Sequence, residues 1–177
     1  TCYAPISYIS AVVMLLMQGV SDGSQPLISL AYGEGKHDTT KAVRDLAYRF
    51  AFGVAVVCSV VLFLLRGSAA HLFGASEQVT MLVAQILPIF IIGFVFVSVS
   101  RVTTAYFYAT GKNLWAYILI YGEPLTLCIL LLILPNAMGS VNGTWVSVPL
   151  SQIIAMLLSL LLIHKNRTLE HQLPSHE

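Results

Sequence analysis

Residues 79–109 read VTMLVAQILPIFIIGFVFVSVSRVTTAYFYA, an apolar run with a single charged residue, Arg101. A helix of about 20 residues crosses the roughly 30 Å hydrocarbon core of a bilayer, so this run is long enough to span a membrane. Polar and apolar residues do not alternate with a period of two, which excludes a strand of a transmembrane β-barrel. The run therefore predicts a transmembrane helix.

Further apolar runs lie on both sides of this one, at residues 5–32, 50–65, 114–134 and 145–163. The chain is 57% hydrophobic and only 10% charged, whereas soluble domains carry roughly 25% charged residues. Such a composition suits lipid, because lipid-facing positions need no polar coat. The predicted fold class is all-α, a polytopic transmembrane bundle of about five membrane-spanning helices. Residues 1–167 form the bundle, and residues 168–177 are expected to be a cytoplasmic tail.

The basic residues are distributed unevenly between the two ends of this bundle. Most lie in the connection at residues 34–45, just after it, in the turn near residue 112, or after the last span. These are Lys36, Lys41, Arg44, Arg49, Lys112, Lys165 and Arg167. By the positive-inside rule this end is cytoplasmic. We therefore expect an external N-terminal end and a cytoplasmic C-terminus in the plasma (inner) membrane.

Several classes of function are disfavoured by what the sequence contains. The three cysteines lie far apart, and no GxSxG, HExxH or phosphate-binding loop is present, so neither an enzyme, a metal site nor an organic cofactor is predicted. The net charge of +1 provides no general field for nucleic acid. The chain begins at Thr1 within an apolar stretch, and we expect it to be a fragment of a longer protein.

Three ionisable residues lie within the predicted spans: Asp22, Arg101 and Glu123. Each is about 11 residues, or roughly 15 Å of helix, from the basic end of its span. Three separate spans thus bring a charge to one depth near the bilayer midplane, where an unpaired charge is costly. Together they carry a net negative charge, enough to hold a proton, a sodium ion or an organic cation. Gln25, in the polar string of the first span, is a further candidate for this cavity.

Two interpretations of these charges remain open. Asp22 and Arg101 could form a static ion pair that only holds helices together. Glu123 is the sharper candidate for an ion-coupling role, because one arginine cannot fully neutralise two carboxylates. Either carboxylate could instead face a water-filled space without pairing.

Residues that weaken a helix accompany the charges. Gly19, Gly23 and Pro26 lie around the centre of the first span, and Pro124 follows Glu123 directly. Glycine lowers helix propensity and proline removes a backbone donor, so these positions predict helix bends of the kind that mark binding sites in transporters. Ordinary proline kinks are the alternative. The polar inner half of the third span, residues 98–108, fits a cavity wall.

Four segments in order resemble those of multidrug and toxin extrusion (MATE) transporters. GVSDGSQPLISLAYGEG at 19–35 resembles the eighth helix of that family, and HLFG at 71–74 followed by SEQV at 76–79 resembles the segment before the tenth. YFYATGK at 106–112 is similar to the end of the tenth helix, and NGTWVSVPLS at 142–151 to the opening of the twelfth. The matches span nearly the whole chain.

The resemblance implies a twelve-helix exporter of two six-helix lobes, of which this chain supplies helices eight to twelve, a partial C-terminal lobe. Such proteins exchange cationic or amphipathic drugs for sodium ions or protons by alternating access. Family members often carry acidic cation ligands on helices one, seven and ten. Here the tenth helix carries Arg101 and no acid, so the family's ion site is not carried over to this chain.

The leading hypothesis is therefore an ion-coupled drug antiporter. Its expected partners are cationic or amphipathic small molecules, the lipid bilayer and the N-terminal lobe, with H⁺ or Na⁺ as coupling ion. One alternative is a flippase for lipid-linked saccharides from the same superfamily, which would need a larger and more basic cavity. Another is a non-transporting membrane scaffold or accessory subunit, in which the charge cluster would be dispensable.

Overall fold

The chain folds into five helices without strands over the residues that the computed structural model describes, 3–68, 74, 76–139 and 142–172. They are α1 (Tyr3–Gly33), α2 (His37–Leu65), α3 (Glu77–Ala109), α4 (Asn113–Met138) and α5 (Asn142–Gln172). Each is long and apolar enough to cross a membrane, which confirms the predicted all-α transmembrane fold. Every predicted span lies within one of these helices.

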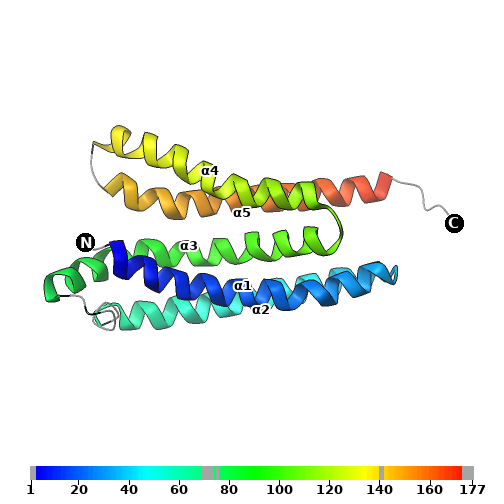
Figure 1. Ribbon diagram of the computed structural model, residues 1–177, viewed down its shortest axis with the longest axis horizontal. Coiled ribbons are helices and arrows are strands. Elements are labelled where there is room, and N and C mark those ends of the chain that lie inside the picture. The colour runs from blue at the N-terminus through cyan, green and yellow to red at the C-terminus, as the bar shows by residue number, and fades with distance from the viewer. Residues whose placement is uncertain (1–2, 69–73, 75, 140–141, 173–177) are drawn as a thin grey trace.

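Helix α3 occupies the centre of the bundle (Figure 1). It contacts each of the other four helices, while α1 pairs with α2 and α4 pairs with α5. Large side chains such as Met17, Leu87 and Phe94 are fully buried where α1 and α3 meet. Many apolar side chains on the outer faces of α2 and α4 are exposed, as expected for surfaces in contact with lipid.

The connection expected at residues 34–45 is much shorter than predicted. Helix α2 begins at His37, so only a tight turn separates it from α1. Gly35 adopts a φ of 73°, and the Lys36 N–H donates to the Ala31 carbonyl at 2.9 Å. This is the glycine turn that commonly ends a helix, because glycine adopts positive φ without a Cβ clash.

The first turns of α2 are helical because they are amphipathic, a property that a hydropathy scan for spans does not detect. One face of α2 is buried at Thr40, Arg44, Ala47, Ala51 and Ala55, positions spaced three or four residues apart as one helix face requires. The other basic residues of this segment lie on the exposed face. Charged residues therefore extend the helix beyond the apolar run.

The turn between α3 and α4 repeats the same device. Gly111 has a φ of 72°, and the Lys112 N–H donates to the Phe107 carbonyl at 2.8 Å. The Lys112 ammonium donates to Asn166 Oδ1 at 2.6 Å, which ties this turn to α5. Both glycine turns and the C-terminal end of α5 lie at the same end of the bundle (Figure 1).

Two other expectations concern helix continuity. Helix α5 runs to Gln172, so the first part of the segment expected as a tail continues the helix, and residues 173–177 lie outside the described residues. Helix α1 is continuous through Gly19, Gly23 and Pro26, with a shallow curve in Figure 1 and no break. A Cβ added at Gly19 or Gly23 would have no atom within 4 Å, so neither glycine is needed for a close approach of another helix.

Gly143, by contrast, allows the start of α5 to approach the end of α4. A Cβ added there would lie 2.8 Å from the carbonyl carbon and oxygen of Leu134 and 2.9 Å from the Pro135 nitrogen. Backbone atoms cannot rotate aside, so Gly143→Ala is expected to lower the free energy of unfolding by about 1–3 kcal/mol. Thermal unfolding of the full-length protein in detergent, followed by circular dichroism, measures this loss.

Gly53→Ala is the matched control, since nothing lies within 4 Å of a Cβ added at that position in α2. Alanine favours the helix by up to about 1 kcal/mol there, so its unfolding midpoint should stay level or rise. If Gly143→Ala unfolded at the same temperature as the wild type, this would contradict the close approach of α4 and α5.

Candidate functional site

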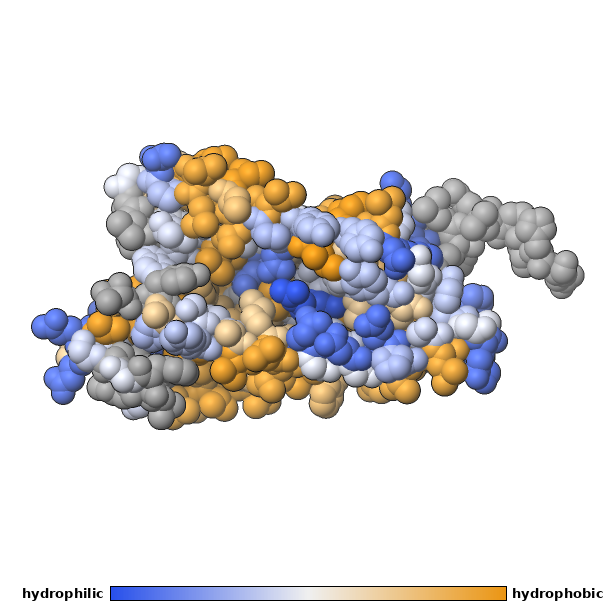
Figure 2. Space-filling model, viewed as in Figure 1, coloured by the Kyte–Doolittle hydropathy of each residue, from blue (hydrophilic) through white to orange (hydrophobic). Residues whose placement is uncertain are grey.

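A polar groove lies between α1, α3 and α4. Figure 2 shows it as a hollow in the middle of the molecule in which hydrophilic residues gather. Its volume is about 290 Å³. The residues that line it are Gln18, Ser21, Asp22, Gln25, Arg101, Thr104, Ala105, Tyr108 and Ile120. Three of the four candidates named from the sequence, Asp22, Gln25 and Arg101, thus line one space.

The fourth candidate, Glu123, reaches the same region through an ion pair. Its Oε2 lies 3.7 Å from Nη2 of Arg101, which links α4 to α3. The Glu123 side chain is 18% exposed and that of Arg101 36%, so the pair is partly shielded from solvent. An ion pair in this position is worth more than a surface pair and less than a fully buried one.

Asp22 does not form the ion pair with Arg101 that the sequence left open, and its hydrogen-bond partner is Gln18. The Gln18 amide donates to Asp22 Oδ1 at 2.7 Å, one turn earlier on α1. Within the described part of the chain, no ion pair joins Asp22 to Arg101 or to any other basic group. Its carboxylate is exposed in the groove. Arg101 therefore pairs with Glu123 and not with Asp22.

Two neutral side chains that carry oxygen atoms line the groove together with Asp22. Ser21 is 2% exposed, and its hydroxyl lacks a hydrogen-bond partner among the described residues. Gln25, one turn after Ser21, is half-buried in the same wall. Carboxylate, hydroxyl and amide oxygens are the ligand types that suit hard cations. The wall of α1 can therefore offer oxygen donors of both charged and neutral kinds.

The polar half of α3 divides between two faces. Arg101, Thr104 and Tyr108 line the groove, at the spacing of one helix face. Thr103 points towards α2, where its hydroxyl lies 2.7 Å from the Tyr48 hydroxyl, and Tyr106 lies beneath the Arg44 guanidinium. The cavity wall expected from residues 98–108 is thus formed by one stripe of that segment only.

Sequence reasoning missed Gln18 and Ser21 as members of the site. The signal that could have found them is helical periodicity: Gln18 precedes Ser21 and Asp22 by three and four residues, and Gln25 follows them by four and three, so the four line one groove from one side of α1. Among the described residues, no group of three His, Cys, Asp or Glu side chains could hold a metal ion.

Comparison with known proteins gives one match. The model of a protein family described as MatE matches residues 3–133, which covers α1 to α3 and most of α4. No curated protein and no solved structure matches the chain.

Proposed function

The chain belongs to the MatE family of membrane transporters, and from this premise we propose that it is part of a secondary antiporter. In this proposal the protein exports cationic or amphipathic small molecules in exchange for H⁺ or Na⁺ by alternating access. The chain is a multi-pass membrane protein. We place it in the plasma membrane with its basic end in the cytoplasm, following the positive-inside rule.

One observation carries the proposal: the groove and its margin hold two carboxylates, Asp22 and Glu123, and one arginine. With all three ionised the net charge is −1. A negative charge that lines a groove between helices is stabilised by a bound cation, and the attraction is stronger than between ions in bulk water. An organic cation and a coupling ion can therefore compete for the same place, as exchange requires.

The roles of the charged groups follow from their partners. Arg101 neutralises Glu123 and joins α3 to α4, so this pair supports the wall of the groove. Asp22 has a neutral hydrogen-bond partner, Gln18, and exchanges the coupling ion in our proposal. Pro26 on α1 and Pro124 on α4 are the positions at which we expect these walls to bend during transport.

The proposal is tested by ethidium efflux from cells that express the full-length gene. We expect faster efflux than from cells with an empty vector, and loss of that difference when the driving gradient is collapsed. A protonophore collapses the proton gradient, and replacement of Na⁺ by K⁺ removes the sodium gradient, so the two treatments identify the ion. Efflux that survives both treatments together would contradict an ion-coupled antiporter.

A further inference from the structure

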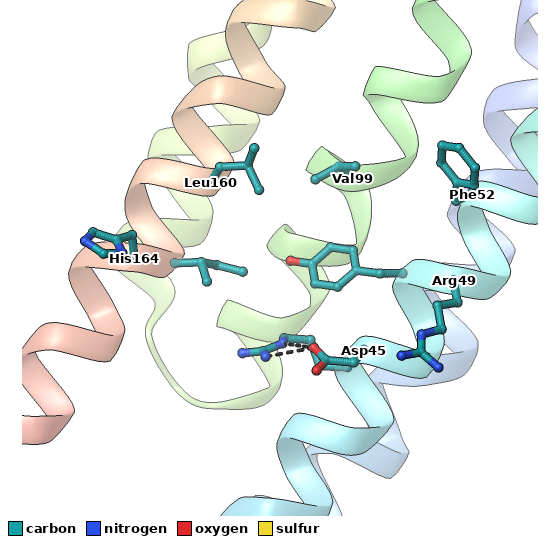
Figure 3. A pocket seen from close by; sticks show the side chains of 9 residues that line it. Asp45, Arg49, Phe52, Val99, Leu160 and His164 are labelled. Carbon is teal, nitrogen blue, oxygen red and sulfur yellow. Dashed lines mark hydrogen bonds and ion pairs between the residues drawn. The ribbon is translucent and has the colours of Figure 1, made fainter.

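A second groove lies on the other side of α3, between α2 and α5 (Figure 3). Its volume is about 550 Å³. Val99 of α3 forms part of its back wall, whereas Arg101, two residues later, lines the polar groove between α1 and α4. Residues two apart on a helix point to nearly opposite sides, so the two grooves are separate.

This second groove is amphipathic along its length. Its ionisable residues, Arg44, Asp45, Arg49 and His164, form its charged end and lie just outside the apolar runs at 50–65 and 145–163. Its apolar residues, Phe52, Leu160 and Ile163, lie inside those runs. Figure 3 shows Phe52, Val99 and Leu160 at one level and Asp45, Arg49 and His164 closer to the other end. The charged end therefore lies on the basic side of the apolar runs at 50–65 and 145–163, and the apolar walls extend into those runs.

The charged end carries a net positive charge. The Arg44 side chain is 3% exposed and donates to Asp45 Oδ1 from Nε at 3.0 Å and from Nη2 at 2.8 Å. These two residues neutralise each other, and the Arg44 guanidinium also lies 5.2 Å from the centroid of the Tyr106 ring. Arg49 is exposed, and no carboxylate of the described residues lies within 4.0 Å of its guanidinium. Its charge is available to a ligand.

We propose that this groove binds an anionic phospholipid, with Arg49 contacting the phosphate and an acyl chain lying against Phe52, Val99 and Leu160. Basic pockets between transmembrane helices favour anionic headgroups. A zwitterionic lipid carries its own cation and gains less from Arg49. Another helix packed into this groove would bury the Arg49 charge at a cost, whereas a phosphate neutralises it.

The test is native mass spectrometry of the full-length protein in detergent, titrated with phosphatidylglycerol or phosphatidylcholine. We expect one phosphatidylglycerol to bind more tightly than phosphatidylcholine. Arg49→Gln should weaken that binding about fivefold, the worth of one basic residue near a charged lipid surface, and Arg49→Lys should retain it. Arg66→Gln is the matched control, since Arg66 is also exposed but lies at the other end of α2.

Three results with these variants and lipids would overturn the proposal, and a fourth concerns inorganic phosphate. They are unchanged phosphatidylglycerol binding by Arg49→Gln, equal affinity of the wild type for both lipids, and an equal loss in Arg66→Gln. Displacement of the lipid by millimolar inorganic phosphate would also overturn it, because the apolar walls would then contribute nothing. The unfolding midpoint of Arg49→Gln, expected to match that of Arg49→Lys, separates a lost lipid contact from a misfolded protein.

Discussion

Asp22→Asn is expected to reduce gradient-driven efflux to the level of cells without the transporter. Asparagine keeps the shape of the side chain and an oxygen that can accept the hydrogen bond from Gln18, so only the charge is lost. A unit charge about 4 Å from a cation contributes on the order of 4 kcal/mol at an effective dielectric constant near 20. We therefore expect at least about a tenfold lower rate of ethidium efflux.

The matched control for this change is Asp38→Asn. Asp38 is fully exposed in the first turn of α2 and its contact with Lys41 is long, at 4.0 Å, so the same chemical change there should leave efflux unaltered. Expression and membrane insertion of both variants are compared by immunoblot. Wild-type efflux by Asp22→Asn at equal expression would remove Asp22 from the coupling mechanism.

The fold was largely predictable from hydropathy because lipid imposes long, uninterrupted apolar helices. Each apolar run became the interior of one helix. The helix ends were less accessible to this reasoning, as the first turns of α2 show. His37 to Arg49 is polar on one face and buried at Thr40 and Arg44 on the other, so its helix is stabilised by packing and not by apolar composition. A scan that weighs only mean hydropathy assigns such a segment to a loop.

Depth along the spans predicted part of the membership of the site, but depth alone does not determine which charged groups pair. Equal depth along the spans predicted that Asp22 and Arg101 lie close together, and both line one groove. Depth does not, however, indicate the direction in which each helix points its side chains. The missing signal was the hairpin: Arg101 and Glu123 lie about equally far from the turn at Gly111, so antiparallel α3 and α4 place them opposite each other. Asp22 reaches the groove from α1, outside this hairpin.

The second groove was not predictable from the sequence for the same reason. Arg44 and Arg49 served in the sequence only as evidence for the cytoplasmic side. Packing of α2 against α3 buries Arg44 and leaves Arg49 exposed, a difference that composition and charge counting cannot express. Whether a basic residue sets topology, supports a wall or meets a ligand depends on the face on which it lies.

Replacing Arg101 by alanine is expected to destabilise the protein and to abolish efflux together, because it leaves Glu123 without its partner. A fully buried pair that loses one member costs about 3–5 kcal/mol and an exposed pair about 0–1 kcal/mol. The partial exposure of both side chains places the expected loss between these limits, near 2 kcal/mol. Thermal unfolding of the full-length protein in detergent measures it, with Arg66→Ala, at the far end of α2, as the control.

A double-mutant cycle separates the ion pair from the general need for a positive charge in the groove. If Arg101 acts on stability through Glu123, Arg101→Ala with Glu123→Gln should recover most of the lost stability, since neither charge then lacks a partner. Efflux should recover only in part, because Asp22 remains while the support between α3 and α4 is gone. Purely additive losses in the cycle would mean that the 3.7 Å approach of the two side chains contributes nothing. In that case Arg101 would act on Asp22 or on the substrate directly, and the assignment of Glu123 as its partner would be wrong.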